Sequence, residues 1–204
     1  MLEAHDLAGT RGHARLFAGI SFRVEAGHAL IVTGANGSGK TTLLRMLAGL
    51  TAPAAGAIRW KGAVAAPFDP RLRAAVAFVG HLSALKNELS AAENLASLVA
   101  LSGASASPDQ IEAALDAVAL SKQRTLPTRA LSQGQRRRIG LARLSLSRNP
   151  LWILDEPGTA LDSDGAALLA SMARRHLDAG GCAVIATHQP LALSPAHTTT
   201  LSLG

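Results

Sequence analysis

The sequence predicts an α/β fold built around a parallel sheet. Residues 29–32 form a continuous apolar run, typical of a strand buried on both faces, and residues 151–154 and 182–186 repeat that pattern. A glycine-rich loop separates the first run from a helical pattern over residues 41–50. A strand, a loop and a helix in this order are typical of a parallel α/β sheet.

The composition fits one large folded domain. The chain has 204 residues, of which 48% are hydrophobic and 17% are charged, and a domain typically takes about 100–200 residues. Such a chain can bury a sizeable core, which excludes intrinsic disorder. Because the chain has no Tyr, two Trp and four Phe, that core must be aliphatic.

Further strands are predicted on both sides of the first helix. Near the start we expect short strands, since Phe22 and Val24 alternate with polar residues before a turn at 26–27. Residues 58–61 and 76–79 are two more strand candidates.

The second half of the chain is predicted to be mostly helical. A helical insertion covers about residues 85–148, and within it Ser107 and Pro108 form a good helix start, with a capping serine before a proline in the first turn. A further helix is expected over residues 166–177, and a last strand over 199–203.

The composition also excludes several classes of function. With so few aromatic side chains, the chain lacks the stacking platforms that bind single-stranded nucleic acid. Cys182, the only cysteine, cannot form an internal disulfide, and its apolar strand predicts a core position, as for Trp152. Early acidic residues and the lack of an apolar run of about 18 residues predict neither a signal peptide nor a membrane span.

Positive charge is concentrated in one segment. The chain carries 20 Lys and Arg against 14 Asp and Glu, a formal net charge of +6, and residues 121–150 hold eight basic residues and no acid. Two interpretations remain open, a surface for phosphate or lipid headgroups and the solvated face of a helix. The lack of interleaved aromatics favours the second, and nucleic acid is not expected as a partner.

Residues 34–41 match the phosphate-loop motif G-x-x-x-x-G-K-[ST] in its required context, after a strand and before a helix. In this motif backbone N–H groups converge on phosphate oxygens, Lys40 reaches the β- and γ-phosphates, and the Thr41 hydroxyl ligates Mg²⁺. The expected ligands are therefore ATP and Mg²⁺. The predicted nucleotide-binding segment is Gly34, Ala35, Asn36, Gly37, Ser38, Gly39, Lys40, Thr41 and Thr42.

Four further motifs follow in order. They are Leu-Ser-Gln-Gly-Gln at 131–135, Leu-Trp-Ile-Leu-Asp-Glu-Pro at 151–157, Ala-Leu-Asp at 160–162 and Thr-His at 187–188. In this order they resemble the signature motif, Walker B motif, D-loop and switch histidine of ABC-type ATPases. The resemblance implies a P-loop NTPase of ABC type, with a parallel core sheet, an N-terminal antiparallel β subdomain and an inserted helical subdomain. It implies a single nucleotide-binding domain over residues 1–204, with the helical subdomain at about 85–148.

The resemblance also assigns catalytic and metal-binding roles that elementary chemistry supports. Asp155 ends an apolar strand, where its carboxylate can hold Mg²⁺ or its water beside the loop. Glu156 is the candidate to polarise the attacking water, and Lys40 completes the catalytic set. His188 closes a second apolar strand and could bind the γ-phosphate, although a lone histidine is more often solvated or satisfied in the core.

Ser132 and Gly134, followed by Gln135, are predicted to present a helix N-terminus to an anion. In the resembled family that anion is the γ-phosphate held by the other subunit, which implies a head-to-tail homodimer of nucleotide-binding subunits around two ATP molecules. The alternative interpretation of Ser132 is an ordinary helix cap.

Two positions depart from the family pattern. His81 stands where the family usually has the Q-loop glutamine that meets Mg²⁺, which suggests that ATP hydrolysis depends on pH near the unperturbed histidine pKa of about 6.5. Arg11 stands where an aromatic side chain usually stacks on adenine. A guanidinium can stack on a base, so we expect adenine binding with modest ATP-over-GTP selectivity.

Among ABC-type ATPases, the stretches around Gly80, Leu141 and Leu154, together with Thr-His-Gln-Pro at 187–190, resemble the haem-export ATP-binding subunits of bacterial cytochrome c maturation complexes. This implies multi-spanning membrane subunits of that complex as partners, and a peripheral location on the cytoplasmic face of the bacterial inner membrane. The alternatives are the ATPase of another ABC transporter and a soluble ABC ATPase without a transport role.

Overall fold

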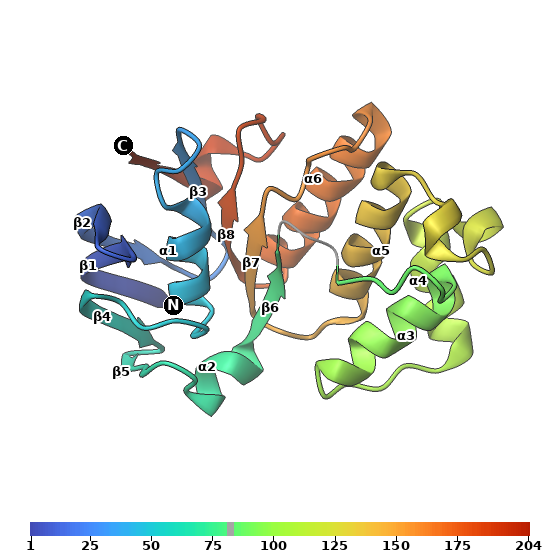
Figure 1. Ribbon diagram of the computed structural model, residues 1–204, viewed down its shortest axis with the longest axis horizontal. Coiled ribbons are helices and arrows are strands. Elements are labelled where there is room, and N and C mark those ends of the chain that lie inside the picture. Colours follow the sequence, from blue (N-terminus) through green and yellow to red (C-terminus); the bar gives the residue numbers. More distant parts are fainter. Residues whose placement is uncertain (81–83) are drawn as a thin grey trace. The chain divides into compact units, whose positions relative to one another are not determined.

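The computed structural model describes residues 1–80 and 84–204, and the chain divides into two compact units. Unit 1 comprises residues 1–80, 149–157 and 173–204. Unit 2 comprises the described residues within 81–148 and residues 158–172. Figure 1 shows the helices and strands that make up each unit.

A parallel sheet forms the centre of unit 1. Within the described residues its strands lie in the order β6-β7-β8-β3-β9, and every neighbouring pair is parallel. The strands are β3 (Ala29–Gly34), β6 (Val76–Val79), β7 (Leu151–Asp155), β8 (Cys182–Ala186) and β9 (Thr198–Leu203). Every residue of β7 and β8 is buried. This confirms that the apolar runs are central strands of one parallel sheet.

An antiparallel sheet forms the second layer of unit 1, in the order β2-β1-β4-β5 among the described residues. Its strands are β1 (Leu2–Arg11), β2 (Ala14–Val24), β4 (Ala55–Trp60) and β5 (Ala63–Val64). The expectation of short strands at the start was wrong, because β1 and β2 have 10 and 11 residues. Register shifts along β1 break the period-two alternation.

Helix α1 (Lys40–Leu47) lies between the two sheets of unit 1 (Figure 1) and contacts β1, β3, β7 and β8. Its Leu43, Leu44 and Leu47 are fully buried, as the helical spacing predicted. The predicted extent to residue 50 was wrong, because α1 ends at Leu47 and Leu50 is 37% exposed. Helix α2 (Pro70–Ala75) was not predicted, because six residues are too few for a periodic signal. Asp69 caps it by accepting a 2.8 Å hydrogen bond from the Arg71 N–H.

In the described part of unit 2, helices α3 (Ala91–Leu101), α4 (Pro108–Ala117) and α5 (Gln133–Leu146) pack on one another. The 3-10 turns η1 (Ser121–Gln123) and η2 (Thr128–Ala130) connect α4 to α5, and a third, η3 (Pro195–His197), precedes β9 in unit 1. The helix start at Ser107 and Pro108 is confirmed, with a capping box that Ser107 shares with Gln110. Helix α6 (Ser163–Asp178) has residues in both units and begins earlier than predicted, since Asp162 accepts from the Gly165 N–H.

The two predicted core residues are buried, with Trp152 5% and Cys182 2% exposed. Trp152 stacks on His176, with ring centroids 4.0 Å apart. Burial raises the pKa of the Cys182 thiol, so the residue behaves as a small hydrophobe. The structural interpretation of both residues is confirmed.

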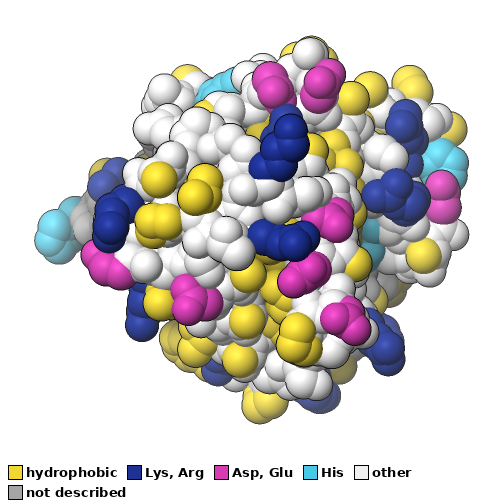
Figure 2. Space-filling model, turned by 90° about the vertical axis from the view of Figure 1, so that its right-hand side faces the viewer, with side chains coloured by type: hydrophobic (Ala, Val, Ile, Leu, Met, Phe, Trp, Pro, Cys, Tyr) yellow, Lys and Arg dark blue, Asp and Glu magenta, His cyan; other side chains and the backbone are white. Residues whose placement is uncertain are grey.

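The arginines that the basic segment places on helix α5, at 136–138 and 143, do not form the solvated helix face that the sequence favoured, although Lys122, Arg129 and Arg148 of the same segment are exposed. Arg137 is only 4% exposed, Arg136 Nε donates to the Thr128 carbonyl at 2.8 Å, and Arg138 Nη2 lies 2.6 Å from Asp162 Oδ1. Burial lowers the pKa of Arg143. On the face in Figure 2, Lys and Arg lie among Asp and Glu rather than in one patch. The correction follows from carbonyl and carboxylate partners that a charge count does not reveal.

Candidate nucleotide-binding site

The loop between β3 and α1 is shaped by glycines in conformations that other residues rarely adopt. Gly37 and Gly39 have φ values of 89° and 101°, where a side chain would be strained. A Cβ atom on Gly39 would also lie 2.9 Å from Cδ1 of Phe17. No side chain of the described residues caps α1 at Gly39, so the N–H groups of its first turn can receive an anion.

A pocket of about 210 Å³ opens over this loop. It is lined by Arg11, Leu16, Asn36, Gly37, Gly39, Lys40, Thr41, Thr42 and Glu156. Among the described residues the buried Ser38 hydroxyl, in the same loop, has no hydrogen-bond partner. A buried polar atom of this kind normally has a partner, and phosphate oxygens fit the requirement.

The Lys40 ammonium is held over the loop that precedes it. The side chain is buried, and Nζ donates to the carbonyl oxygens of Gly34 at 2.7 Å and Ala35 at 3.2 Å. Two carbonyl partners keep a buried cation satisfied. These two contacts also fix the positive charge of Lys40 beside the phosphate loop.

Thr41 and Asp155 place two hard oxygen ligands side by side. Thr41 Oγ1 donates to Asp155 Oδ2 at 2.8 Å, and Asp155 is only 2% exposed at the end of β7. The residues that the structure describes contain no group of three or more His, Cys, Asp or Glu able to hold a metal. Mg²⁺ commonly takes only one or two protein oxygens and completes its shell with waters and substrate phosphates, so these residues could hold it.

Glu156 follows directly in a strained backbone conformation. Its φ is 50°, and its N–H donates to the Ala186 carbonyl at 2.9 Å. His188 Nε2 lies 3.2 Å from Glu156 Oε1, so the histidine contacts the carboxylate. The sequence predicted a contact of His188 with the γ-phosphate. Backbone strain such as that of Glu156 is concentrated at functional sites.

The signature residues begin helix α5 in unit 2. Ser132 Oγ accepts from the Gln135 N–H at 3.2 Å, and Gln135 Oε1 accepts from the Ser132 N–H at 3.0 Å, which forms a capping box. Ser132 is therefore a helix cap, the alternative that the sequence left open. The cap leaves the hydroxyl proton available to an anion.

The signature start is packed against the D-loop within unit 2. A Cβ atom on Gly134 would lie 2.6 Å from the Ala160 carbonyl oxygen, so only glycine fits there. The Gly165 N–H and Arg138 bind Asp162 and lower the pKa of its carboxyl. Two motifs that are 25 residues apart in the sequence thus form one local assembly.

The structure brings most of the predicted unit 1 residues to one place, and one further predicted residue lies outside the described part of the chain. Gathered in unit 1 are Lys40, Thr41, Asp155, Glu156 and His188, with Arg11 on the pocket wall. His81 lies outside the described residues. Sequence reasoning missed Leu16 as a lining residue, because an apolar residue in an edge strand carries no motif.

Comparison with known proteins identifies the family. The pattern of the family described as ABC transporter matches residues 17–159. The chain belongs to the ABC transporter family. It is an ABC-type ATPase, and the family and fold class predicted from the sequence are confirmed.

Two curated relatives of this ABC ATPase span nearly the whole chain. Both are named cytochrome c biogenesis ATP-binding export protein CcmA. The protein from Pseudomonas aeruginosa is 49% identical, covering 97% of this chain and 98% of its own. The one from Dechloromonas aromatica is 46% identical and covers all of both chains. A solved ATP-binding subunit of an ABC transporter has a TM-score of 0.81 at 25% identity, covering 98% of this ABC ATPase and 85% of that chain.

Among the described residues of this ABC ATPase, no helix has both the length and the apolar character to cross a bilayer.

Proposed function

We propose that this ABC ATPase hydrolyses ATP for a bacterial cytochrome c biogenesis complex that exports haem. The observation that carries its catalytic part is the contact between Glu156 and His188 at the pocket that holds Lys40 and Thr41. The cytochrome c assignment is supported by the name of the relatives that are 49% and 46% identical over almost the full length.

The residues of unit 1 divide the work of holding the nucleotide. The N–H groups of the phosphate loop and the start of α1 bind the phosphates, and Ser38 donates its buried hydroxyl to one of their oxygens. Lys40 exchanges its two carbonyl contacts for the β- and γ-phosphates. Arg11 lies at the pocket wall where the base is expected, so that its guanidinium can stack on adenine.

Thr41 and Asp155 are the proposed Mg²⁺ residues, with Thr41 as a direct ligand and Asp155 as a ligand or a holder of a metal-bound water. When bound, the ion neutralises charge that develops on the transferred phosphate. His81 was predicted to take part at the Q-loop position, and that role stays a proposal.

Glu156 is the proposed general base. Its carboxylate accepts a proton from the attacking water while the water oxygen bonds to the γ-phosphorus and the bond to the β-phosphate oxygen breaks. His188 orients that carboxylate through its 3.2 Å contact. The contact holds Glu156 before substrate arrives, which lowers the cost of positioning it in the transition state.

We further propose that the two units form one nucleotide-binding domain, with unit 2 containing the helical subdomain, and that two such chains dimerise. Ser132, Gly134 and Gln135 of one chain then contact the γ-phosphate held by the other. The remaining partners are multi-spanning membrane subunits of the cytochrome c maturation complex. The chain then lies peripherally on the cytoplasmic face of the inner membrane.

The test is an affinity purification of the tagged Glu156→Gln chain with Mg-ATP from detergent-solubilised membranes. Recovery of multi-spanning subunits together with a haem-binding maturation protein is the expected result. Recovery of another permease would keep the ATPase and overturn the cytochrome c assignment. A chain found only in the soluble fraction would overturn the transport role.

A further inference from the structure

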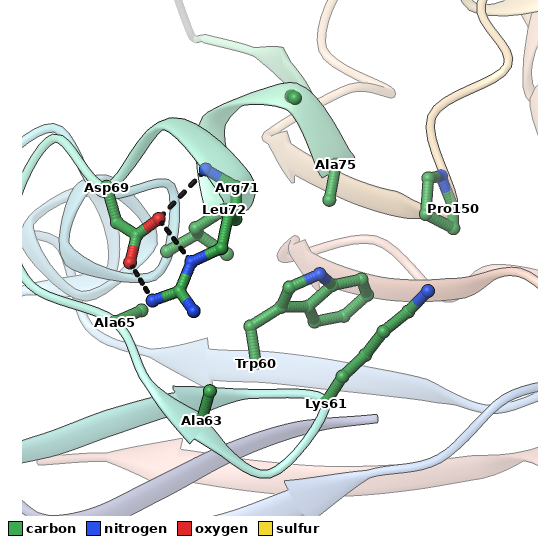
Figure 3. Close-up of a pocket in the computed structure, with 10 residues that line it drawn as sticks. Trp60, Lys61, Ala63, Ala65, Asp69, Arg71, Leu72, Ala75 and Pro150 are labelled. Atoms are coloured by element: carbon green, nitrogen blue, oxygen red, sulfur yellow. Dashed lines mark hydrogen bonds and ion pairs between the residues drawn. The ribbon is translucent and has the colours of Figure 1, made fainter.

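A second pocket in unit 1 shares no lining residue with the nucleotide pocket. It has a volume of about 520 Å³ and is formed by the end of β4, by β5, by α2 and by Pro150 ahead of β7 (Figure 3). Trp60 and Leu72 contribute apolar side chains that are 8% and 1% exposed. We call this cavity the Trp60 pocket.

The rim of the Trp60 pocket carries excess positive charge. Lys61 Nζ lies 5.8 Å from the centre of the Trp60 ring. Besides its backbone N–H, Arg71 binds Asp69 through two side-chain hydrogen bonds, Nη2 to Oδ2 at 2.7 Å and Nε to Oδ1 at 3.2 Å (Figure 3). This pairing holds the pKa of Asp69 at about 2, so the acid stays ionised and its charge is offset by Arg71.

The charge excess extends along the chain around the pocket. Residues 59–73 contain four basic residues and one acid, Asp69. Besides Lys61 and Arg71, the exposed arginines are Arg59 and Arg73. The surface is therefore complementary to an acidic partner.

Phe68, which immediately precedes Asp69, occupies a turn position that suits glycine. The Asp69 N–H donates to the Ala66 carbonyl at 3.1 Å and closes the turn, and the φ of Phe68 is 63°. For an L-residue this left-handed conformation costs about 1–2 kcal/mol. The side chain is 59% exposed, so burial in this chain does not offset that cost. Neither the turn nor the core requires a phenylalanine.

Two other exposed hydrophobic residues are linked to Phe68 through the chain, since Val64 stands four residues before it and Leu50 follows its backbone partner Gly49. Val64 belongs to β5 and is 52% exposed, and Leu50 is 37% exposed. The Phe68 N–H donates to the carbonyl of Gly49, the residue before Leu50. Single exposed apolar residues are ordinary, but an exposed phenylalanine next to Asp69, which lines the pocket together with Trp60 and Arg71, has the composition of a protein interface.

We propose that the Trp60 pocket and Phe68 together dock an acidic segment of a membrane subunit that inserts one apolar side chain into the pocket. The proposal rests on the proposed function, which supplies the membrane subunits. A polypeptide is favoured over an anionic bilayer because the pocket is concave and can enclose one inserted side chain, which a layer of headgroups does not supply.

The test compares variants of the tagged full chain. Each variant is expressed in the organism from which the chain comes and is purified from detergent-solubilised membranes. The readout is the amount of multi-spanning subunit recovered per chain. Phe68→Gly is expected to recover at least about tenfold less, since a central interface aromatic commonly contributes 2 kcal/mol or more. Lys61→Glu is expected to lower recovery as well, and Lys61→Arg to keep it. Leu101→Ala, at an 84% exposed position of unit 2, is the matched control and is expected to recover the wild-type amount.

Thermal unfolding of the purified chains separates docking from a structural role. Phe68→Gly relieves the left-handed strain, so its Tm is expected to equal or exceed that of the wild type. Full recovery of the subunits by Phe68→Gly, or a lowered Tm that accompanies the loss, would overturn the proposal. The proposal would also be overturned if Phe68→Gly bound vesicles of anionic phospholipid less than the wild type does and still recovered the wild-type amount of membrane subunit. If the wild type recovers no multi-spanning subunit, the proposed function itself fails.

Discussion

Helices α1 and α5 both begin at a predicted phosphate-binding motif, but the two starts are built differently. The first turn of α1 follows Gly39, and no side chain of the described residues caps it. Helix α5 begins at Ser132, and a complete capping box with Gln135 satisfies its first N–H groups. The same box opens α3 and α4, at Ser90 and Ser107.

The loop before α1 needs a ligand to satisfy its hydrogen-bonding groups, whereas the start of α5 is already satisfied by its own capping box. The loop before α1 leaves N–H groups and the buried Ser38 hydroxyl for phosphate oxygens to satisfy. The start of α5 can offer an anion only the Ser132 hydroxyl proton and the remaining helix dipole. We therefore expect α1 to bind nucleotide within one chain, and α5 to contribute only when a second chain presents a γ-phosphate.

The largest effect is expected at the open start. Lys40→Ala removes the buried cation that faces the phosphates, and kcat/KM for ATP should fall about 1,000-fold, because one preorganised charge contributes several kcal/mol. Nucleotide binding by the isolated chain, measured by calorimetry, should weaken as well. Lys61→Ala is the matched control, since Lys61 does not line the nucleotide pocket. The ATP affinity of this variant should equal that of the wild type. Normal ATP affinity in Lys40→Ala would remove the distinction between the two helix starts.

Ser132→Ala tests the capped start. The variant should bind ATP with normal affinity as an isolated chain but hydrolyse it about 100-fold more slowly, as expected for the loss of one donor to a developing anion. It should also lose about 1 kcal/mol of stability as a lost cap. Ser107→Ala, which breaks the same kind of box in α4, should lose the same stability and keep the hydrolysis rate. Equal rates in the two variants would make Ser132 a cap and nothing more.

A smaller effect is expected from Gly134→Ala. Alanine favours a helix by about 1 kcal/mol, but its Cβ would lie 2.6 Å from the Ala160 carbonyl and must displace the D-loop. We expect hydrolysis to fall about tenfold while ATP affinity stays normal. Steady-state kinetics check this, and an unchanged rate would show that the contact is dispensable.

The smallest effect concerns pH. In α3 the box partner is Glu93, and hydrogen bonds from Ser90 hold the pKa of Glu93 below its ordinary value of 4.5. Because the folded pKa is lowered, this stabilisation is complete above the ordinary value and is lost as pH falls through the folded one. Glu93→Gln should therefore flatten the drop in Tm as the pH falls below the ordinary value of 4.5. In α5 the box partner is Gln135, which has no carboxyl group to titrate. Gln135→Ala should therefore shift Tm by the same amount above and below that pH.

The sequence allowed the chemistry of the unit 1 site to be predicted, because each residue stands at a fixed offset from a strand end. Asp155 and His188 are 33 residues apart, but β7 and β8 are parallel neighbours, so residues that follow those strands meet at one edge of the sheet. The contact between His188 and Glu156 was not predictable, because it depends on the 50° φ of Glu156.

Other features could not be predicted for a different physical reason. The bulges of β1 hide its true length, and α2 is too short for helical periodicity. The charge run misled, because Arg137 is buried and Arg138 is paired with Asp162 from a distant segment. Non-local hydrogen bonds of this kind leave no trace in a count of charges.

The most direct test of the account is the mass of the Glu156→Gln chain in solution with Mg-ATP, measured by sedimentation velocity. We predict that ATP doubles the mass from the 20.9 kDa of one chain, and that adding Ser132→Ala restores the single-chain mass while ATP stays bound. An ATP-bound single chain in Glu156→Gln, or a dimer that survives Ser132→Ala, would contradict the proposed division of work between the two helix starts.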